Sequence, residues 1–274
     1  MADDPGFAPA KVNLALHVVG QRSDGLHLLD SLVAFADIGD HLKAKLAHRS
    51  SISITGPMAA GVPSDGQNLV LQAARWIGVS AEFQLEKHLP AAAGIGGGSS
   101  DAAAALRLLS RLTSQPIPSG AAALGADVPV CLRPGSTRMR GVGDRLEPVT
   151  LPALPALLVN PGVPVPTGAV FAALTNKDNA PMPVEIPDIP TPEQAALWLA
   201  SQRNDLQIPA LSLVPEIGDV LARLAALPGA RLARMSGSGA TCFALFDTIE
   251  AASTAQATLH ADHSDWWVAA TQLH

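Results

Sequence analysis

The segment from Lys87 to Leu106 joins a glycine-rich loop to the start of an alanine-rich helix. Glycine occupies four of the five positions 94–98, so side chains do not cover the backbone amides there. Ser99 and Ser100 follow where a helix N-cap is expected, and the helix dipole favours an anion at that end. This arrangement predicts a phosphate-binding site, with a flexible loop that leads into a helix as the alternative.

The loop differs from the two most common phosphate-binding motifs. It lacks the Gly-Lys-Ser/Thr ending of a Walker A loop, and Ser99 stands where the dinucleotide-binding pattern requires its last glycine. Apolar and polar residues alternate over 81–86, which predicts a half-buried strand just before the loop. The helix that Ser99 opens is expected to reach about Leu112, because Pro116 cannot continue it.

The composition excludes several classes of protein. The chain has 274 residues, of which 48% are hydrophobic, and can bury a substantial core. A net charge of -6 with scattered basic residues argues against nucleic acid as a partner. No stretch reaches the roughly 18 uninterrupted apolar residues of a membrane span, and the N-terminus lacks a signal-peptide pattern. We therefore expect a cytoplasmic protein with neither a nucleic-acid nor a membrane partner.

The two cysteines, Cys131 and Cys242, lie far apart in the sequence, each within an apolar run. This predicts two buried free thiols rather than a disulfide or a metal pair, with a nucleophilic cysteine as the alternative. Free thiols are typical of a reducing compartment.

The first forty residues have the pattern of a β-hairpin. Alternation over 11–19 predicts a strand in which Lys11 and Asn13 share one face, and a second strand is expected at 31–38. Prolines at 148, 152 and 155 mark the expected domain boundary, which divides the chain into 1–150 and 151–274.

The second half combines expected helices and strands. Helical spacing is found over 217–224 and 250–260, and strands are expected at 241–246 and 266–270. This order predicts an α+β sandwich with helices on one face of an antiparallel sheet. The proline-rich segment 181–192 is expected to be an extended, exposed loop. The glycine turn at 235–240 is either a tight structural turn or a loop that contacts a ligand.

Four separated features of the chain, taken together, carry a resemblance to a known family. They are the Lys11 and Asn13 strand, the loop at 94–100, Asp127 within the segment 125–129, and the turn at 237–239. With these features the chain resembles the GHMP kinase superfamily over nearly its whole length. The resemblance implies an α+β, two-domain fold with an N-terminal ribosomal-protein-S5-like domain and a C-terminal ferredoxin-like domain.

The motifs at 8–14, 24–27, 125–129 and 141–146 are similar to one branch of this superfamily. That branch uses ATP and Mg²⁺ to phosphorylate the 2-hydroxyl of a cytidine diphosphate sugar-alcohol conjugate, on the non-mevalonate route to isoprenoid precursors. The resemblance implies that ATP is contacted by Asn68, Pro90, Gly94, Gly96, Gly97, Gly98, Ser99 and Ser100. Ser100 is also a candidate contact for Mg²⁺. The resemblance implies substrate contacts from Asn13, His27, Thr167, Phe171, Gly237, Ser238 and Gly239.

Phosphoryl transfer needs a group that accepts the proton of the attacking hydroxyl. We expect Asp127 to do this and Lys11 to keep it ionised, within about 6 Å of each other. Taken alone, Asp127 also fits a turn or N-cap aspartate and Lys11 a solvated lysine at a strand edge. Asn68 also fits a helix N-cap, and His27 an exposed turn histidine.

Two departures separate the chain from the pattern of its branch. Leu26 stands where a tyrosine usually stacks on cytosine, and the chain contains no tyrosine. The segment 111–121 is short, which we expect to trim a surface element and leave Asp127 in place. The competing functions are another GHMP kinase, acting on homoserine, mevalonate or a sugar, and a non-catalytic nucleotide-binding protein. We expect a monomer or a weak dimer.

Overall fold

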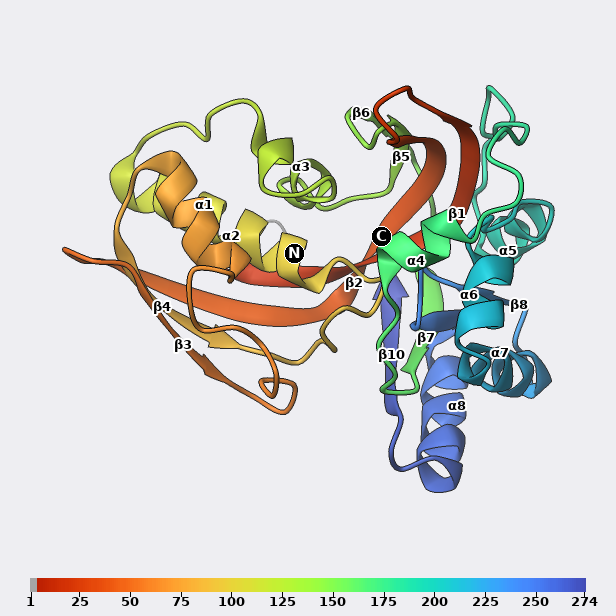
Figure 1. The fold of residues 1–274 in the computed structure, drawn as a ribbon. Coiled ribbons are helices and arrows are strands. Elements are labelled where there is room, and N and C mark those ends of the chain that lie inside the picture. The colour runs from red at the N-terminus through yellow and green to blue at the C-terminus, as the bar shows by residue number, and fades with distance from the viewer. Residues whose placement is uncertain (1–3) are drawn as a thin grey trace. The chain divides into compact units, whose positions relative to one another are not determined.

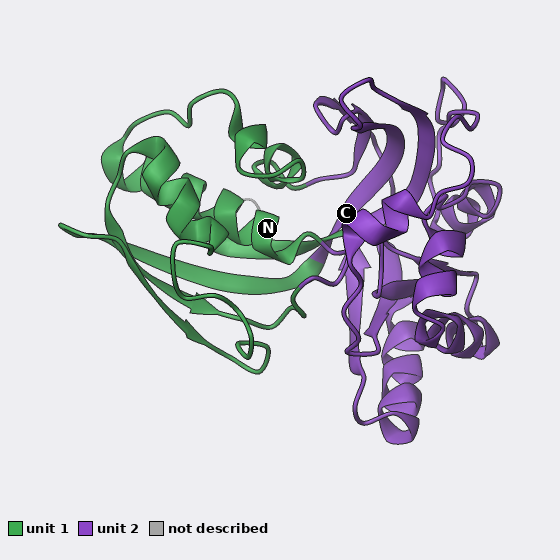
Figure 2. Ribbon diagram, in the orientation of Figure 1, with its two compact units in different colours: residues 1–11, 37–91, 96–134 green, residues 12–36, 92–95, 135–274 purple. Residues whose placement is uncertain are grey.

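The computed structural model describes residues 4–274 and contains two compact units (Figures 1 and 2). The first unit comprises residues 4–11, 37–91 and 96–134, and the second comprises 12–36, 92–95 and 135–274. Strands β1 (Phe7–Gln21) and β2 (His27–Leu46) pass from one unit into the other. For this reason the bounds of the units differ from the predicted segments 1–150 and 151–274.

The predicted N-terminal hairpin is confirmed, because β1 pairs with β2. The turn between them is closed by the backbone N–H of Arg22, which donates to the carbonyl of Leu26 at 2.8 Å. Both strands are longer than predicted. Residues 8–18 of β1 are all buried, so both faces of the strand are covered and alternation does not mark its ends.

The first unit combines a small sheet with two packed helices. The second half of β2 pairs antiparallel with β4, and β4 pairs parallel with β3. Helices α1 and α2 pack against each other, and Phe83, Leu85, Leu106 and Leu109 are fully or almost fully buried. Its remaining elements are β3 (Ser51–Thr55), α1 (Leu69–Ile77), β4 (Ala81–Glu86), α2 (Gly97–Thr113), the 3₁₀ helix η1 (Ala121–Ala123) and α3 (Val128–Cys131). The strand predicted at 81–86 is confirmed.

The predicted start of α2 is wrong by two residues. Gly96, with φ 64°, is its N-cap and makes no side-chain capping bond, while Ser99 and Ser100 lie inside the first turn. Gly97 and Gly98 are the first two residues of the helix and lie in ordinary contact with their neighbours. A Cβ on Gly97 would lie 3.6 Å from Lys87 Nζ, and one on Gly98 would lie 3.5 Å from Leu69. The helix therefore begins at a glycine in the left-handed conformation and not at a serine cap.

The second unit is built on an antiparallel sheet in the order β10-β7-β9-β8. The first half of β2 pairs with β5, which pairs with β6. Helices α5, α7 and α8 pack against the sheet strands, as predicted for this half of the chain (Figure 1). The elements are β5 (Thr137–Gly141), β6 (Arg145–Pro148), β7 (Leu154–Asn160), α4 (Thr167–Ala172), α5 (Pro192–Ala200), α6 (Gln207–Leu213), α7 (Glu216–Ala226), β8 (Leu232–Met235), β9 (Cys242–Leu245), α8 (Ile249–Asp262) and β10 (Trp267–Leu273).

The segment 181–192 contains no helix or strand before Pro192, but the prediction that it is exposed is wrong for part of its length. Met182 is 1% exposed and Ile189 is 5% exposed. The buried guanidinium of Arg138, which forms an ion pair with Asp30, also donates to the carbonyls of residues 182–184. The sequence does not show this anchor because Arg138 lies far away in the chain.

Both cysteines are free and buried, as predicted. Burial raises the pKa of Cys131 to about 12, and it also raises the pKa of Cys242. The two thiols are therefore protonated at neutral pH and poor nucleophiles. Within residues 4–274, no helix is long and apolar enough to cross a membrane.

His17 is buried on β1 in a site that fits a neutral imidazole. Its Nδ1 lies 3.2 Å from the carbonyl oxygen of Ala180, and the backbone N–H of Arg203 donates to its Nε2 at 3.3 Å. One ring nitrogen therefore donates and the other accepts. Burial, helped by the charge of Arg203, lowers the pKa of His17, although Asp205 and Asp30 oppose the shift.

We expect the stability contributed by His17 to be lost in mild acid. Because the pKa is lower in the folded protein, the unfolded chain binds the proton first as the pH falls below about 6.5. The free energy of unfolding should thus drop more between pH 7 and pH 5 in the wild-type protein than in His17→Gln. Urea unfolding at pH 7, 6 and 5 measures this difference, and parallel pH profiles for the two proteins would rule it out.

Candidate active site

Lys11 and Asp127 form an ion pair in the first unit. Lys11 Nζ lies 2.9 Å from Asp127 Oδ2, which confirms the expected proximity. The lysine side chain is 5% exposed and therefore is not a solvated strand-edge residue. Asp127 precedes α3, but its side chain makes no capping bond and faces the lysine instead. The carboxylate is 36% exposed, so a ligand can reach it.

The glycine loop lies close to this ion pair. A Cβ on Gly96 would stand 3.3 Å from the Cβ of Lys11 and 3.4 Å from its Cε, so Gly96 packs on the lysine stem. The first turn of α2 follows at once, with backbone amides that have no partner within the helix. Fully buried Ser100 presents an Oγ atom without a nitrogen or oxygen partner among the described residues. Gly96, a helix N-terminus, a cation and a carboxylate therefore occur together in one unit.

A second, fully buried ion cluster supports the loop and was not predicted. Lys87 Nζ contacts the carboxylate of Asp40 and lies 2.9 Å from Asp101 Oδ2. Asp40 also accepts the backbone N–H groups of His88 and Leu89. The cluster thus ties the residue after β4 to Asp101, just beyond the first turn of α2. Its members lie far apart in the chain, and no periodic pattern links them.

The charges of this cluster affect one another. Burial disfavours the ammonium of Lys87, but the carboxylates of Asp101 and Asp40 outweigh this and raise the pKa of Lys87. Burial, with a contribution from Asp40, raises the pKa of Asp101 to about 7 against the opposing charge of Lys87. Two carboxylates share one cation here, so protonation of one of them relieves the excess negative charge.

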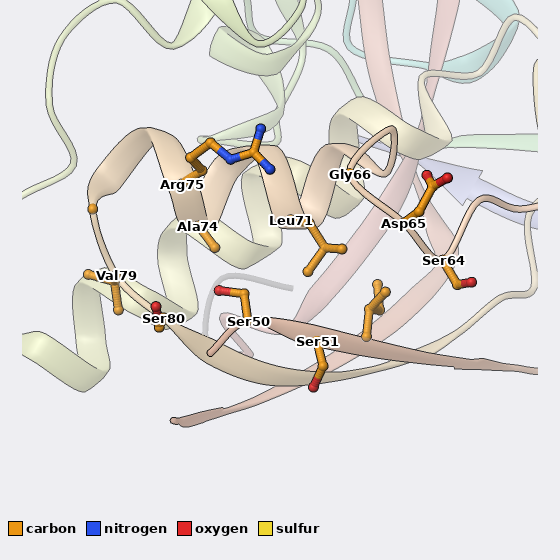
Figure 3. A pocket seen from close by; sticks show the side chains of 12 residues that line it. Ser50, Ser51, Ser64, Asp65, Gly66, Leu71, Ala74, Arg75, Val79 and Ser80 are labelled. Atoms are coloured by element: carbon orange, nitrogen blue, oxygen red, sulfur yellow. The ribbon is translucent and has the colours of Figure 1, made fainter. Parts of the chain in front are cut away.

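Asn68 is the N-cap of α1. Its Oδ1 accepts the backbone N–H of Val70 at 2.9 Å, and its Nδ2 donates to the carbonyl of Pro63 at 2.7 Å. These two bonds satisfy the side chain of Asn68 without a ligand, and its contact with ATP stays a prediction. A cavity of about 660 Å³ lies along the same helix, with Arg75 and Asp65 among its lining residues (Figure 3). None of the predicted site residues lines this cavity.

In the second unit, residues 236–239 form a turn packed tightly against Gly94 and Asn13. Gly94 has φ 73°, and a Cβ there would stand 2.5 Å from the carbonyl oxygen of Ser236, so another residue would clash. Ser236 Oγ donates to the carbonyl of Gly94 and accepts the backbone N–H of Asn13. Asn13 Nδ2 donates to Ser31 Oγ at 2.8 Å, which leaves its buried Oδ1 without a partner among the described residues.

Four of the predicted substrate-binding residues lie in two pairs in the second unit. The rings of His27 and Phe171 stack with centroids 4.7 Å apart and planes 30° apart. Thr167 Oγ1 lies 2.9 Å from Ser238 Oγ. Burial, followed by the charge of Lys177, lowers the pKa of His27, and its buried Nε2 has no partner among the described residues. His27 is therefore a partly buried, neutral imidazole rather than an exposed turn residue.

Comparison with known proteins gives matches over both units. The family described as GHMP kinases N terminal domain matches residues 68–135, and GHMP kinases C terminal matches residues 185–264. Together these segments cover more than half of the chain. The chain belongs to the GHMP kinases. The two-domain α+β fold class implied by the sequence is therefore confirmed.

Curated relatives of this GHMP kinase share one name. The 4-diphosphocytidyl-2-C-methyl-D-erythritol kinase of Dinoroseobacter shibae is 59% identical over 270 residues, which covers 98% of this chain and 94% of the relative. The protein of the same name from Cereibacter sphaeroides is 57% identical over 272 residues, covering 97% and 98%.

Solved structures agree with this family. A crystal structure of 4-(cytidine 5'-diphospho)-2C-methyl-D-erythritol kinase matches with a TM-score of 0.77 and 36% identity, covering 97% of this GHMP kinase and 98% of that chain. A homoserine kinase from Cytophaga hutchinsonii matches with a TM-score of 0.64 and 20% identity, covering 97% and 93%, and shares the fold.

Several residues that build the site were missed in the sequence. Ser31 and Ser236 are buried and hydrogen-bond to Asn13, and Asp40 and Lys87 are buried in the ion cluster that includes Asp101 of α2. A polar residue inside a predicted strand or tight turn is a signal that it needs a partner. The partner itself could not be named, because it lies far away in the chain.

Proposed function

We propose that this GHMP kinase transfers the γ-phosphoryl group of ATP to the 2-hydroxyl of 4-diphosphocytidyl-2-C-methyl-D-erythritol, on the non-mevalonate route to isoprenoid precursors. The chain is an ATP-dependent small-molecule kinase by its family. The observation that carries the proposal is the ion pair of Lys11 and Asp127 beside the glycine loop. Full-length relatives with 57–59% identity support the choice of substrate.

The chemistry begins with the proton of the acceptor hydroxyl. The carboxylate of Asp127 accepts that proton, and the oxygen attacks the γ-phosphorus of ATP. The bond from the γ-phosphorus to the bridging β-γ oxygen breaks, and ADP leaves with the negative charge. Lys11, whose ammonium lies 2.9 Å from the carboxylate of Asp127, offsets the negative charge that develops during the reaction. The free amides at the start of α2 would hold the phosphates.

The residues of the first unit fit Mg²⁺ bound together with ATP. Among residues 4–274 there is no group of three or more His, Cys, Asp or Glu side chains that could hold the ion by themselves. Mg²⁺ in kinases commonly takes most of its ligands from phosphates and water, with one or two side chains. The hydroxyl of Ser100, which has no nitrogen or oxygen partner among the described residues, and the accessible carboxylate of Asp127 are suited to that limited role. The ion would neutralise charge on the phosphates.

The acceptor is proposed to contact the second unit. The neutral His27 can donate from one ring nitrogen and accept at the other, which suits the mixed donors and acceptors of a cytosine edge. The ring of Phe171, already stacked on His27, offers an apolar surface for a base. The unpartnered Oδ1 of Asn13 can accept a hydrogen bond from a hydroxyl of the acceptor. We also propose that the enzyme acts in the cytoplasm, which the two unpaired thiols support.

We expect Leu26→Tyr to strengthen binding of the cytidine substrate. Leu26 is 52% exposed beside His27, so an aromatic ring can be accommodated without repacking a core. A stacked ring contributes about 0.5–1.5 kcal/mol, which corresponds to a KM about 2- to 10-fold lower for that substrate. Initial-rate kinetics with each substrate varied measure this, and KM for ATP serves as the internal control. An unchanged KM for the cytidine substrate would show that position 26 does not contact the base.

A substrate panel tests the proposed function. The purified protein is incubated with Mg²⁺ and ATP, and ADP release is measured with 4-diphosphocytidyl-2-C-methyl-D-erythritol, homoserine, mevalonate and galactose. We expect turnover with the cytidine compound alone. Turnover of homoserine, mevalonate or galactose in its place would assign another GHMP kinase activity. ATP binding without turnover of any of them would indicate a non-catalytic nucleotide-binding protein.

A further inference from the structure

Asn204 is a buried side chain whose hydrogen bonds cross the glycine turn of the second unit. It is 7% exposed and lies between α5 and α6. Its Nδ2 donates to the carbonyls of Met235 and Gly237, each at 2.8 Å. Its Oδ1 accepts the backbone N–H of Leu206 at 3.0 Å. Both amide protons therefore go to carbonyls on either side of Ser236.

The backbone around Asn204 is held by other contacts. Leu16 donates its N–H to the carbonyl of Arg203 at 2.9 Å and accepts the N–H of Asp205 at 2.9 Å. The buried guanidinium of Arg234 donates at 2.8 Å to the carbonyls of Leu14, Leu199 and Gln202. Loss of the Asn204 amide would thus remove two hydrogen bonds to the turn, while the segment that carries Asn204 stays in place.

The turn that Asn204 fixes contacts residues proposed to bind the acceptor. Ser236 Oγ accepts the backbone N–H of Asn13 at 3.0 Å, and Ser238 Oγ lies 2.9 Å from Thr167 Oγ1. At Gly237 the fit is close, because a Cβ there would stand 3.3 Å from the unpartnered Oδ1 of Asn13. A small shift of the turn would therefore change the position of Asn13, which is two residues from Lys11 in the chain.

We propose that Asn204 is a positioning residue for the acceptor site, acting through the turn 236–239. This inference rests on the proposed function only for the choice of acceptor. An alanine or an aspartate at position 204 could not donate either of the two hydrogen bonds to the turn. An aspartate would also place a negative charge against two carbonyl oxygens. Serine keeps one hydroxyl donor, on a shorter side chain.

The test compares Asn204→Ala and Asn204→Ser with Gln202→Ala. Gln202 is a suitable control because it is 8% exposed, lies in the same segment and donates its amide to the hydroxyl of Ser201 rather than to the turn. KM for 4-diphosphocytidyl-2-C-methyl-D-erythritol and KM for ATP are measured for each protein, together with the thermal unfolding midpoint. If the panel identifies a different acceptor, that compound is used in the same comparison.

We expect Asn204→Ala to raise KM for the acceptor by about 10-fold, as for the loss of one net hydrogen bond, and KM for ATP by less than about three-fold. Asn204→Ser should fall between the alanine variant and the wild type, and Gln202→Ala should keep both KM values. A lower unfolding midpoint with unchanged KM values would reduce Asn204 to a structural residue. Equal rises in both KM values would also overturn the inference. If the alanine variant does not fold, the serine variant decides by the same criteria.

Discussion

Replacing Asp127 with asparagine is expected to lower kcat at least about 100-fold, because the variant cannot accept the proton of the attacking hydroxyl. Asparagine has nearly the same size and keeps an oxygen that can face the ammonium of Lys11. The side chain is 36% exposed, so no tightly packed core depends on it. The change should thus act on kcat and leave both KM values within about three-fold of the wild type.

Initial-rate measurements of ADP release, with circular dichroism to verify the fold, provide this test. Asp65→Asn is a matched control, because Asp65 is an exposed carboxylate of the same unit that lines the cavity beside α1. Its Oδ1 accepts the N–H of Gln67, a bond that asparagine can retain. The control should keep a normal kcat. A folded Asp127→Asn enzyme with near-normal turnover would remove Asp127 from the mechanism.

Replacing Lys11 with methionine is the second substitution with a large expected effect. Methionine fills the space of the lysine stem beneath Gly96 but carries no charge, so we expect kcat to fall by about 100-fold or more. Asp127 is then left without its cation, yet it is partly exposed and water can solvate it. The protein should therefore fold with little loss of stability.

The two halves of this ion pair should differ in their effect on stability. Asp127→Ala leaves a 5% exposed ammonium without its partner, which costs about 1–3 kcal/mol of unfolding free energy. Lys11→Met leaves only an accessible carboxylate and should cost less. Urea unfolding of both variants at pH 7 compares them. Equal losses would contradict the burial argument, and a normal kcat in Lys11→Met would refute the proposed role of the ammonium.

Several elements of the fold were predictable because their signals are local. Alternation over 81–86 gives β4, and helical spacing gives α7 and α8. The start of α2 was misplaced because serine is the commoner N-cap, whereas here Gly96 adopts a left-handed conformation that packs on Lys11. The prediction that the segment 181–192 is exposed was partly wrong for a similar reason, because the distant Arg138 anchors this segment.

The candidate site also has features that could be predicted from the sequence and features that could not. The types of residue in it were visible in the sequence, because a glycine loop before a helix, a lysine on a strand and an aspartate in a turn each carry their own chemistry. The resemblance to GHMP kinases then joined these features into one hypothesis. The ion pair between Lys11 and Asp127 was expected and is present at 2.9 Å.

The sequence by itself therefore determined the local elements, the chemical character of the loop and the family. Only the tertiary structure decided which distant polar groups meet. It buries Lys87 between Asp40 and Asp101, places Ser236 between Asn13 and Gly94, and directs Asn204 across the turn. The reason is physical. A buried polar group must find a partner, but the partner is selected by how strands and helices pack, and periodicity along the chain holds no information about that choice.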